Sequence, residues 1–75
     1  MSGMWKANYN DTGWERLLIF PEVIVSNREM IPIMDYIRMK YSSMRGDWEV
    51  LVVGRDIRVF QGSKIHLYRW QEESP

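Results

Sequence analysis

The chain has 75 residues and a formal net charge of zero, so we expect one soluble domain over residues 1–75, with frayed termini at residues 1–3 and 71–75. It has no cysteine, which excludes disulfides and thiolate-bound zinc. The charge balance argues against a committed nucleic-acid binder, because such proteins usually carry a basic excess.

The N-terminal part of the chain predicts two strands joined by a turn. Residues 4–9 form a short strand that is rich in aromatic side chains. Residues 10–13, with the sequence Asn-Asp-Thr-Gly, favour a turn, because Asn and Asp form local side-chain turns and Gly accepts a positive φ. Residues 14–20 predict the second strand. Its apolar run at residues 17–20 is typical of a strand covered on both faces, so we expect this strand at a central position.

A helix is predicted over about residues 27–43. Ser26 and Glu29 have the spacing of a capping box. Apolar side chains recur at helical spacing: Met30, Ile33, Met34, Ile37, Tyr41 and Met44. Pro32 conflicts with a start at Ser26, because a proline inside a helix removes a backbone hydrogen bond. Two starts therefore stay open, one at Ser26 and one at Pro32, and we favour the second.

The part of the chain after the helix predicts strands at residues 48–53, 57–60 and 64–70, with turns at Gly54 and Gly62. The expected fold class is a small two-layer α+β domain, in which an antiparallel sheet of four or five strands packs against one helix. This order of elements resembles that of the β-grasp of ubiquitin-like proteins. A bent sheet that approaches a small barrel, with the two glycines at its corners, is the alternative.

The last predicted strand alternates without a fault. Ile65 and Leu67 point to one side, which we expect to be the core. The other side carries a cation, an imidazole and two large aromatic rings: Lys64, His66, Tyr68 and Trp70. Such a set is unusual for a surface that meets only water, so we predict a binding surface there. The competing interpretation is that these aromatic residues are ordinary core.

The function that we expect is that of a small protein–protein interaction module without enzymatic activity, which also forms homodimers. Accessory proteins of viruses or mobile elements that bind a host factor are often of this kind. The predicted partner-binding residues are Arg58, Lys64, His66, Tyr68, Trp70, Tyr36 and Met39, because Arg, Met and aromatic side chains are enriched at interfaces. The alternative is a single-stranded nucleic-acid binding module that uses the last two strands.

Catalytic, cofactor and metal sites are not expected. His66 is the only histidine, and the serines lie in no nucleophile motif. There is also no glycine-rich loop that could hold a phosphate. Residues 1–11 lack the features of a signal peptide, and the apolar run at residues 17–25 is too short to cross a bilayer. We therefore expect a cytoplasmic protein that does not bind membranes.

Overall fold

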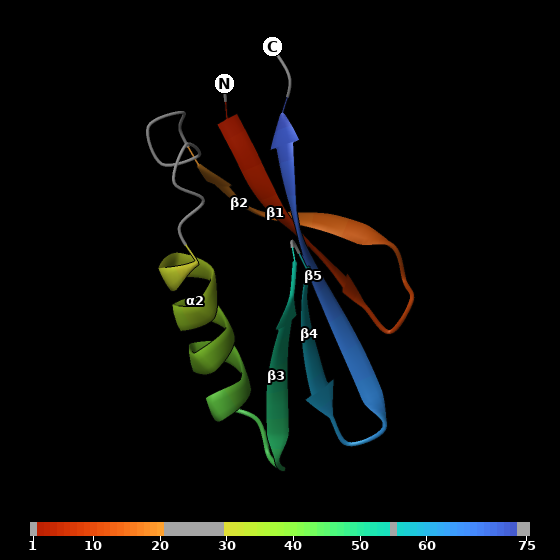
Figure 1. Ribbon diagram of the computed structural model, residues 1–75. Coiled ribbons are helices and arrows are strands. Elements are labelled where there is room, and N and C mark those ends of the chain that lie inside the picture. Colours follow the sequence, from red (N-terminus) through yellow and green to blue (C-terminus); the bar gives the residue numbers. More distant parts are fainter. Residues whose placement is uncertain (1, 21–29, 55, 74–75) are drawn as a thin grey trace.

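The structure is a computed structural model that describes residues 2–20, 30–54 and 56–73. The described residues form one helix and five strands (Figure 1). In chain order these elements are β1 (Ser2–Tyr9), β2 (Trp14–Phe20), α2 (Ile31–Ser42), β3 (Trp48–Val53), β4 (Asp56–Gln61) and β5 (Lys64–Glu73). The predicted small α+β domain with an antiparallel sheet and one helix is confirmed, and the sheet has five strands.

The sheet has the strand order β2-β1-β5-β4-β3, and every neighbouring pair is antiparallel. It is open, with β2 and β3 at its edges among the described residues, so the barrel alternative is wrong. The expectation of a central position for residues 14–20 is wrong as well. A bulge opposite Trp5 and Lys6 shifts the register of β2. The bulge allows two consecutive residues, Leu17 and Leu18, to be partly buried against the core even on an edge strand.

The turn between β1 and β2 lies where the sequence predicts it. Asn10 and Asp11 have φ values of 54° and 59°. The backbone N–H of Thr12 donates to the carbonyl of Tyr9 at 3.1 Å. Two consecutive positive φ angles closed by this hydrogen bond have the geometry of a type I′ turn, whose twist matches that of the flanking strands. The Asn-Asp pair thus forms the turn of this hairpin.

The helix α2 begins at Ile31, with Met30 as its N-cap and Pro32 in its first turn. The start near Pro32 is therefore confirmed, because proline is tolerated where the backbone N–H has no partner within the helix. A start at Ser26 is wrong for this helix, and the predicted capping box lies outside the described residues. At the other end, the hydroxyl of Ser43 donates to the carbonyl of Lys40 at 2.7 Å.

The core lies between α2 and one face of the sheet (Figure 1). Its fully buried members come from α2 and from three central strands: Ile33, Ile37 and Tyr41; Trp5 and Ala7; Ile57 and Val59; Tyr68 and Trp70. The rings of Trp5 and Trp70, which are paired across β1 and β5, meet edge to face with centroids 5.6 Å apart. Met4, which alternates with Trp5 on β1, is also buried but lies outside this cluster.

The expectation that the chain frays at residues 1–3 and 71–75 is wrong for the described residues at both ends. Ser2 and Gly3 pair with Glu73 and Glu72, because β1 and β5 are central neighbours that hold each other's ends in register. Gly3 also makes room for Trp70. A Cβ atom on Gly3 would lie 2.2 Å from Cζ2 of the indole, so the glycine is needed for this ring to pack.

Candidate functional site

The structure reverses the two sides of β5 that the sequence predicts. His66, Tyr68 and Trp70 are 7%, 0% and 4% exposed and lie beneath α2, whereas Ile65 is 51% exposed on the opposite side. The prediction that these three residues form an exposed binding surface is wrong. The physical reason is size. A large aromatic side chain buries about 150–250 Å², more than an aliphatic one, so the sheet gains more by covering the aromatic set.

The other predicted partner-binding residues lie in three separate places. Arg58 and Lys64 are exposed and line a groove on the side of the sheet away from α2. Tyr36 is partly buried and packs against the core. Met39 is 77% exposed on α2. The predicted residues therefore do not make one continuous surface.

Beneath α2, tyrosine and histidine side chains pack into one group, which we call the Tyr–His cluster: Tyr9, Tyr41, His66 and Tyr68. The hydroxyl of Tyr41 forms hydrogen bonds with Nδ1 of His66 and with the hydroxyl of Tyr68, the latter at 2.9 Å. Tyr9 packs edge to face on His66, with centroids 5.4 Å apart. The ammonium of Lys40 lies 3.7 Å from the centroid of the Tyr9 ring, a cation–π contact that closes the cluster from the helix.

Burial keeps the Tyr–His cluster neutral. It lowers the pKa of His66, and the charges of Lys40 and Lys64 lower it further. It also raises the pKa values of Tyr41 and Tyr68, so both phenols stay protonated at neutral pH. Because the helix covers these atoms, a substrate has no approach to them. The cluster is therefore best explained as a polar network that fixes the position of α2 on the sheet.

The side of the sheet away from α2 is the strongest candidate for a functional surface. We call it the open face and define it by Leu51, Val53, Arg58, Phe60, Ile65 and Leu67. The backbone register places Arg58 directly between Leu51 on β3 and Leu67 on β5. Leu51, Val53 and Ile65 are 48%, 46% and 51% exposed. Aliphatic side chains on the two flanking strands, β3 and β5, thus lie on either side of one arginine on β4.

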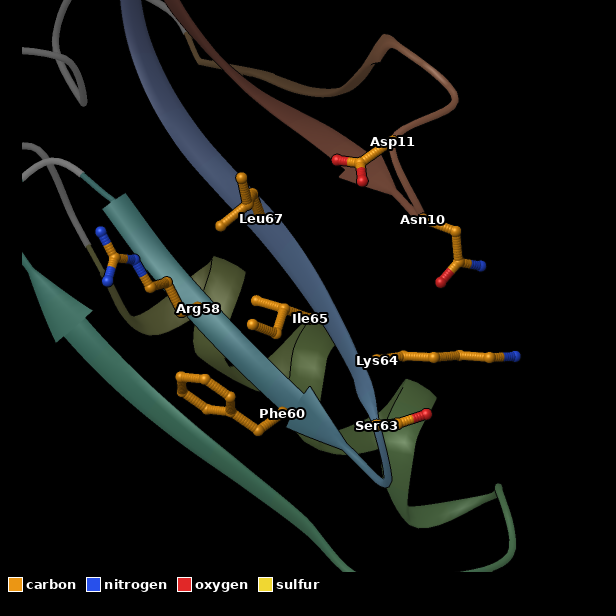
Figure 2. Close-up of a pocket in the computed structure, with 8 residues that line it drawn as sticks. All are labelled: Asn10, Asp11, Arg58, Phe60, Ser63, Lys64, Ile65 and Leu67. Atoms are coloured by element: carbon orange, nitrogen blue, oxygen red, sulfur yellow. The ribbon is translucent and has the colours of Figure 1, made fainter.

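A groove of about 590 Å³ runs along this face, between β4 and β5 and the turn of the β1–β2 hairpin. Figure 2 shows Ile65 and Leu67 of β5 beside Arg58 and Phe60 of β4, with Asn10 and Asp11 of the turn across from them. Ser63 and Lys64 close the end at the β4–β5 turn. The floor is apolar and the rim is polar, which is the usual arrangement of a protein-binding surface.

Two arginines on this side of the sheet have different surroundings. Arg69 donates to both carboxylate oxygens of Asp56, at 3.0 and 3.3 Å, and its guanidinium lies 4.9 Å from the centroid of the Trp14 ring. Arg58 forms no ion pair or hydrogen bond with any described residue. The charge of Arg69 is thus balanced within the fold, whereas Arg58 offers five N–H donors to something else.

Leu51, Val53 and Phe60 were not predicted from the sequence as residues of a binding surface. In β4, Ile57 and Val59 alternate with Arg58 and Phe60. This alternation shows which side of β4 faces the core, because only the set with Arg58 carries a charge. The register then shows that His66 lies opposite Val59, so the aromatic set of β5 belongs to the core.

Comparisons with protein-family models, with curated proteins and with solved structures found no match to this chain. Among residues 2–20, 30–54 and 56–73, no three His, Asp or Glu side chains come together in a group that could hold a metal ion. The described helix is also too short and too polar to cross a membrane. The candidate function therefore depends on the chemistry of the open face alone.

Proposed function

We propose that this protein is a protein-binding module without enzymatic activity, and that it binds another protein surface through the open face. The observation that carries the proposal is the half-exposed aliphatic patch around Arg58, whose side chain pairs with no described residue. Arg and aromatic residues at the centre of an apolar patch are typical of interface hot spots. The cytoplasm is the compartment we propose, since the chain contains no cysteine.

The position of the exposed apolar side chains supports this proposal, whereas the total exposed surface area does not. The chain exposes 5173 Å², close to the about 4,900 Å² expected of a monomer of this mass. The fold as a whole is therefore well packed. What is unusual is that Leu51 and Val53 of β3 and Ile65 of β5, all about half-exposed, lie on the same side of one sheet. Apolar side chains that gather in this way mark interaction sites more often than scattered ones.

The residues on which the nucleic-acid alternative depends are not accessible in the structure. Tyr68 and Trp70, the expected platforms for base stacking, are buried beneath α2. Trp14 is an exposed aromatic ring on the side of the open face, but Arg69 already stacks on it. Base stacking needs a free aromatic face. No observation on the described residues favours this function over protein binding.

Site-specific photo-crosslinking tests the proposed function. A benzophenone amino acid is placed at Ile65 on the open face or, as the matched control, at Met39 on α2, in cells that produce the protein. We expect irradiation to give defined covalent adducts with another protein chain from Ile65 and none from Met39. Equal thermal midpoints of the two labelled proteins show that both are folded. Adducts from Met39 alone, or from neither position, would contradict the proposal.

A further inference from the structure

We propose that the occupant of the open face is a second copy of this chain, placed by a twofold axis so that Arg58 of each protomer pairs with Glu49 of the partner subunit. This inference rests on the proposed function and names its partner. It follows from the position of the charges on the open face, from the charge of the whole chain and from the area of the sheet.

The open face and its rim carry unpaired charges of both signs: Arg58 and Lys64, Glu49 and Asp11. None of the four forms an ion pair with a described residue. A twofold contact uses the same patch on both subunits, so a patch that pairs with itself must contain both signs. The neighbouring Asp56–Arg69 pair is already satisfied within the fold and contributes no free charge.

The register places Arg58 and Glu49 close enough for a twofold axis to pass between them. Arg58 lies opposite Leu51, and Glu49 lies opposite Phe60 in the next row of the same side. Such diagonal neighbours on adjacent strands are about 7–8 Å apart. A twofold axis that lies between the two facing sheets and passes midway between the two residues places each arginine against the other subunit's glutamate. Two equivalent pairs form, with Leu51 and its symmetry mate beside them.

The charge of the whole chain does not oppose this contact. Ten basic and ten acidic side chains give a formal net charge of zero, so two copies approach without long-range repulsion. A chain of near-zero net charge with an exposed apolar patch is prone to associate with itself. The charge pairs then fix the register of an association that the aliphatic residues stabilise.

The size of the open face sets the expected affinity. The three strands of the open face, β3, β4 and β5, at about 4.8 Å spacing and with about six residues of about 3.3 Å each, give a flat area of about 290 Å² per protomer. A standard stable interface buries about 800 Å² per partner. We therefore expect a weak dimer, which covers the open face only when the protein is concentrated or when no tighter partner is present.

A charge exchange tests the pairing by sedimentation equilibrium. Arg58→Glu places two carboxylates together at each pair, and Glu49→Arg places two cations together. We expect each variant alone to weaken dimerisation by at least about tenfold. An equimolar mixture of the two variants restores both pairs in a heterodimer, so its affinity returns to that of the wild type. Restoration by mixing also shows that each variant is folded.

The control is Arg38→Glu, which makes the same charge change on the exposed surface of α2. We expect it to leave dimerisation unchanged. If it weakens the dimer as much as Arg58→Glu does, net charge explains the effect and the pairing is overturned. The pairing is equally overturned if the mixture stays monomeric.

A wild-type protein that stays monomeric at about 500 μM excludes the second copy as the occupant. A crosslink from Ile65 to a different protein would then still support the proposed function, so the two failures can be told apart.

Discussion

Tyr41→Phe removes a single buried oxygen that forms hydrogen bonds with two side chains. In the folded protein this hydroxyl forms hydrogen bonds with Nδ1 of His66 and with the hydroxyl of Tyr68. Tyr41 is completely buried, and the phenylalanine ring keeps its apolar contacts. The substitution therefore tests the polar network of the Tyr–His cluster with little change in packing.

The expected loss follows from the two hydrogen bonds. Each contributes about 0.5–1.5 kcal/mol to stability, so two give about 1–3 kcal/mol. We expect about 2–3 kcal/mol, because Nδ1 of His66 and the hydroxyl of Tyr68 are left buried without this partner. At about 0.05–0.15 kcal/mol per residue, a 75-residue domain has a total stability of about 4–11 kcal/mol. The variant should thus still fold.

Urea denaturation measures this loss as a lower midpoint at an unchanged slope. The matched control is Tyr36→Phe, which removes the hydroxyl of a partly buried tyrosine on the same helix. We expect this control to cost less than about 1 kcal/mol, because water reaches that part of the helix. If Tyr41→Phe costs no more than Tyr36→Phe, the buried network does not stabilise the position of α2, and the reasoning is refuted.

Three further predictions follow from the packing and from the turns. Gly3→Ala should lower stability by about 1–3 kcal/mol in urea, because the added methyl group displaces the indole of Trp70. Burial lowers the pKa of His66 below 6.5, so the unfolded chain binds a proton more readily. The free energy of unfolding should therefore decrease as the pH falls from about 7.5 to about 5.5, and His66→Gln should reduce that slope. Asp11→Gly should increase the free energy of unfolding by about 0.5 kcal/mol and so raise the thermal midpoint, since Asp11 has a positive φ in the type I′ turn.

Each of these three predictions has an outcome that would contradict it. A Gly3→Ala variant with wild-type stability would mean that the Trp70 ring does not lie over Gly3. An unchanged pH slope in His66→Gln would mean that this imidazole is not buried in its neutral form. A lower midpoint in Asp11→Gly would mean that the turn uses the Asp11 side chain more than it needs a free φ.

The positions of the strands could be predicted from the sequence, because a period of two residues and the turn residues between strands are local properties. The side of β5 that faces the core could not be predicted in the same way. Both alternating sets of β5 contain large apolar side chains, so the choice depends on the register with β4, where Ile57 pairs with Tyr68. That register is a long-range property of the fold.

The candidate site could be predicted only in part. Arg58 and Lys64 were predicted as partner-binding residues, because the sequence places them beside the aromatic set of β5. Leu51 and Val53 were not identified, because residues 50–53 are all apolar and a continuous apolar run gives no period of two. These side chains are half-exposed because they lie on the side of the sheet away from α2, and only the fold determines which side that is.

Methyl NMR with a neutral gadolinium chelate, in dilute and in concentrated protein, tests the central claim most directly. We expect the methyl signals of Ile65 and Leu51 to broaden strongly in dilute protein, while those of Ile33 and Ile37 stay sharp. On concentration, the open-face methyls should become protected as this face is covered. Broadening of Ile33 and Ile37 in dilute protein, or protection confined to Met39 on α2, would contradict the account.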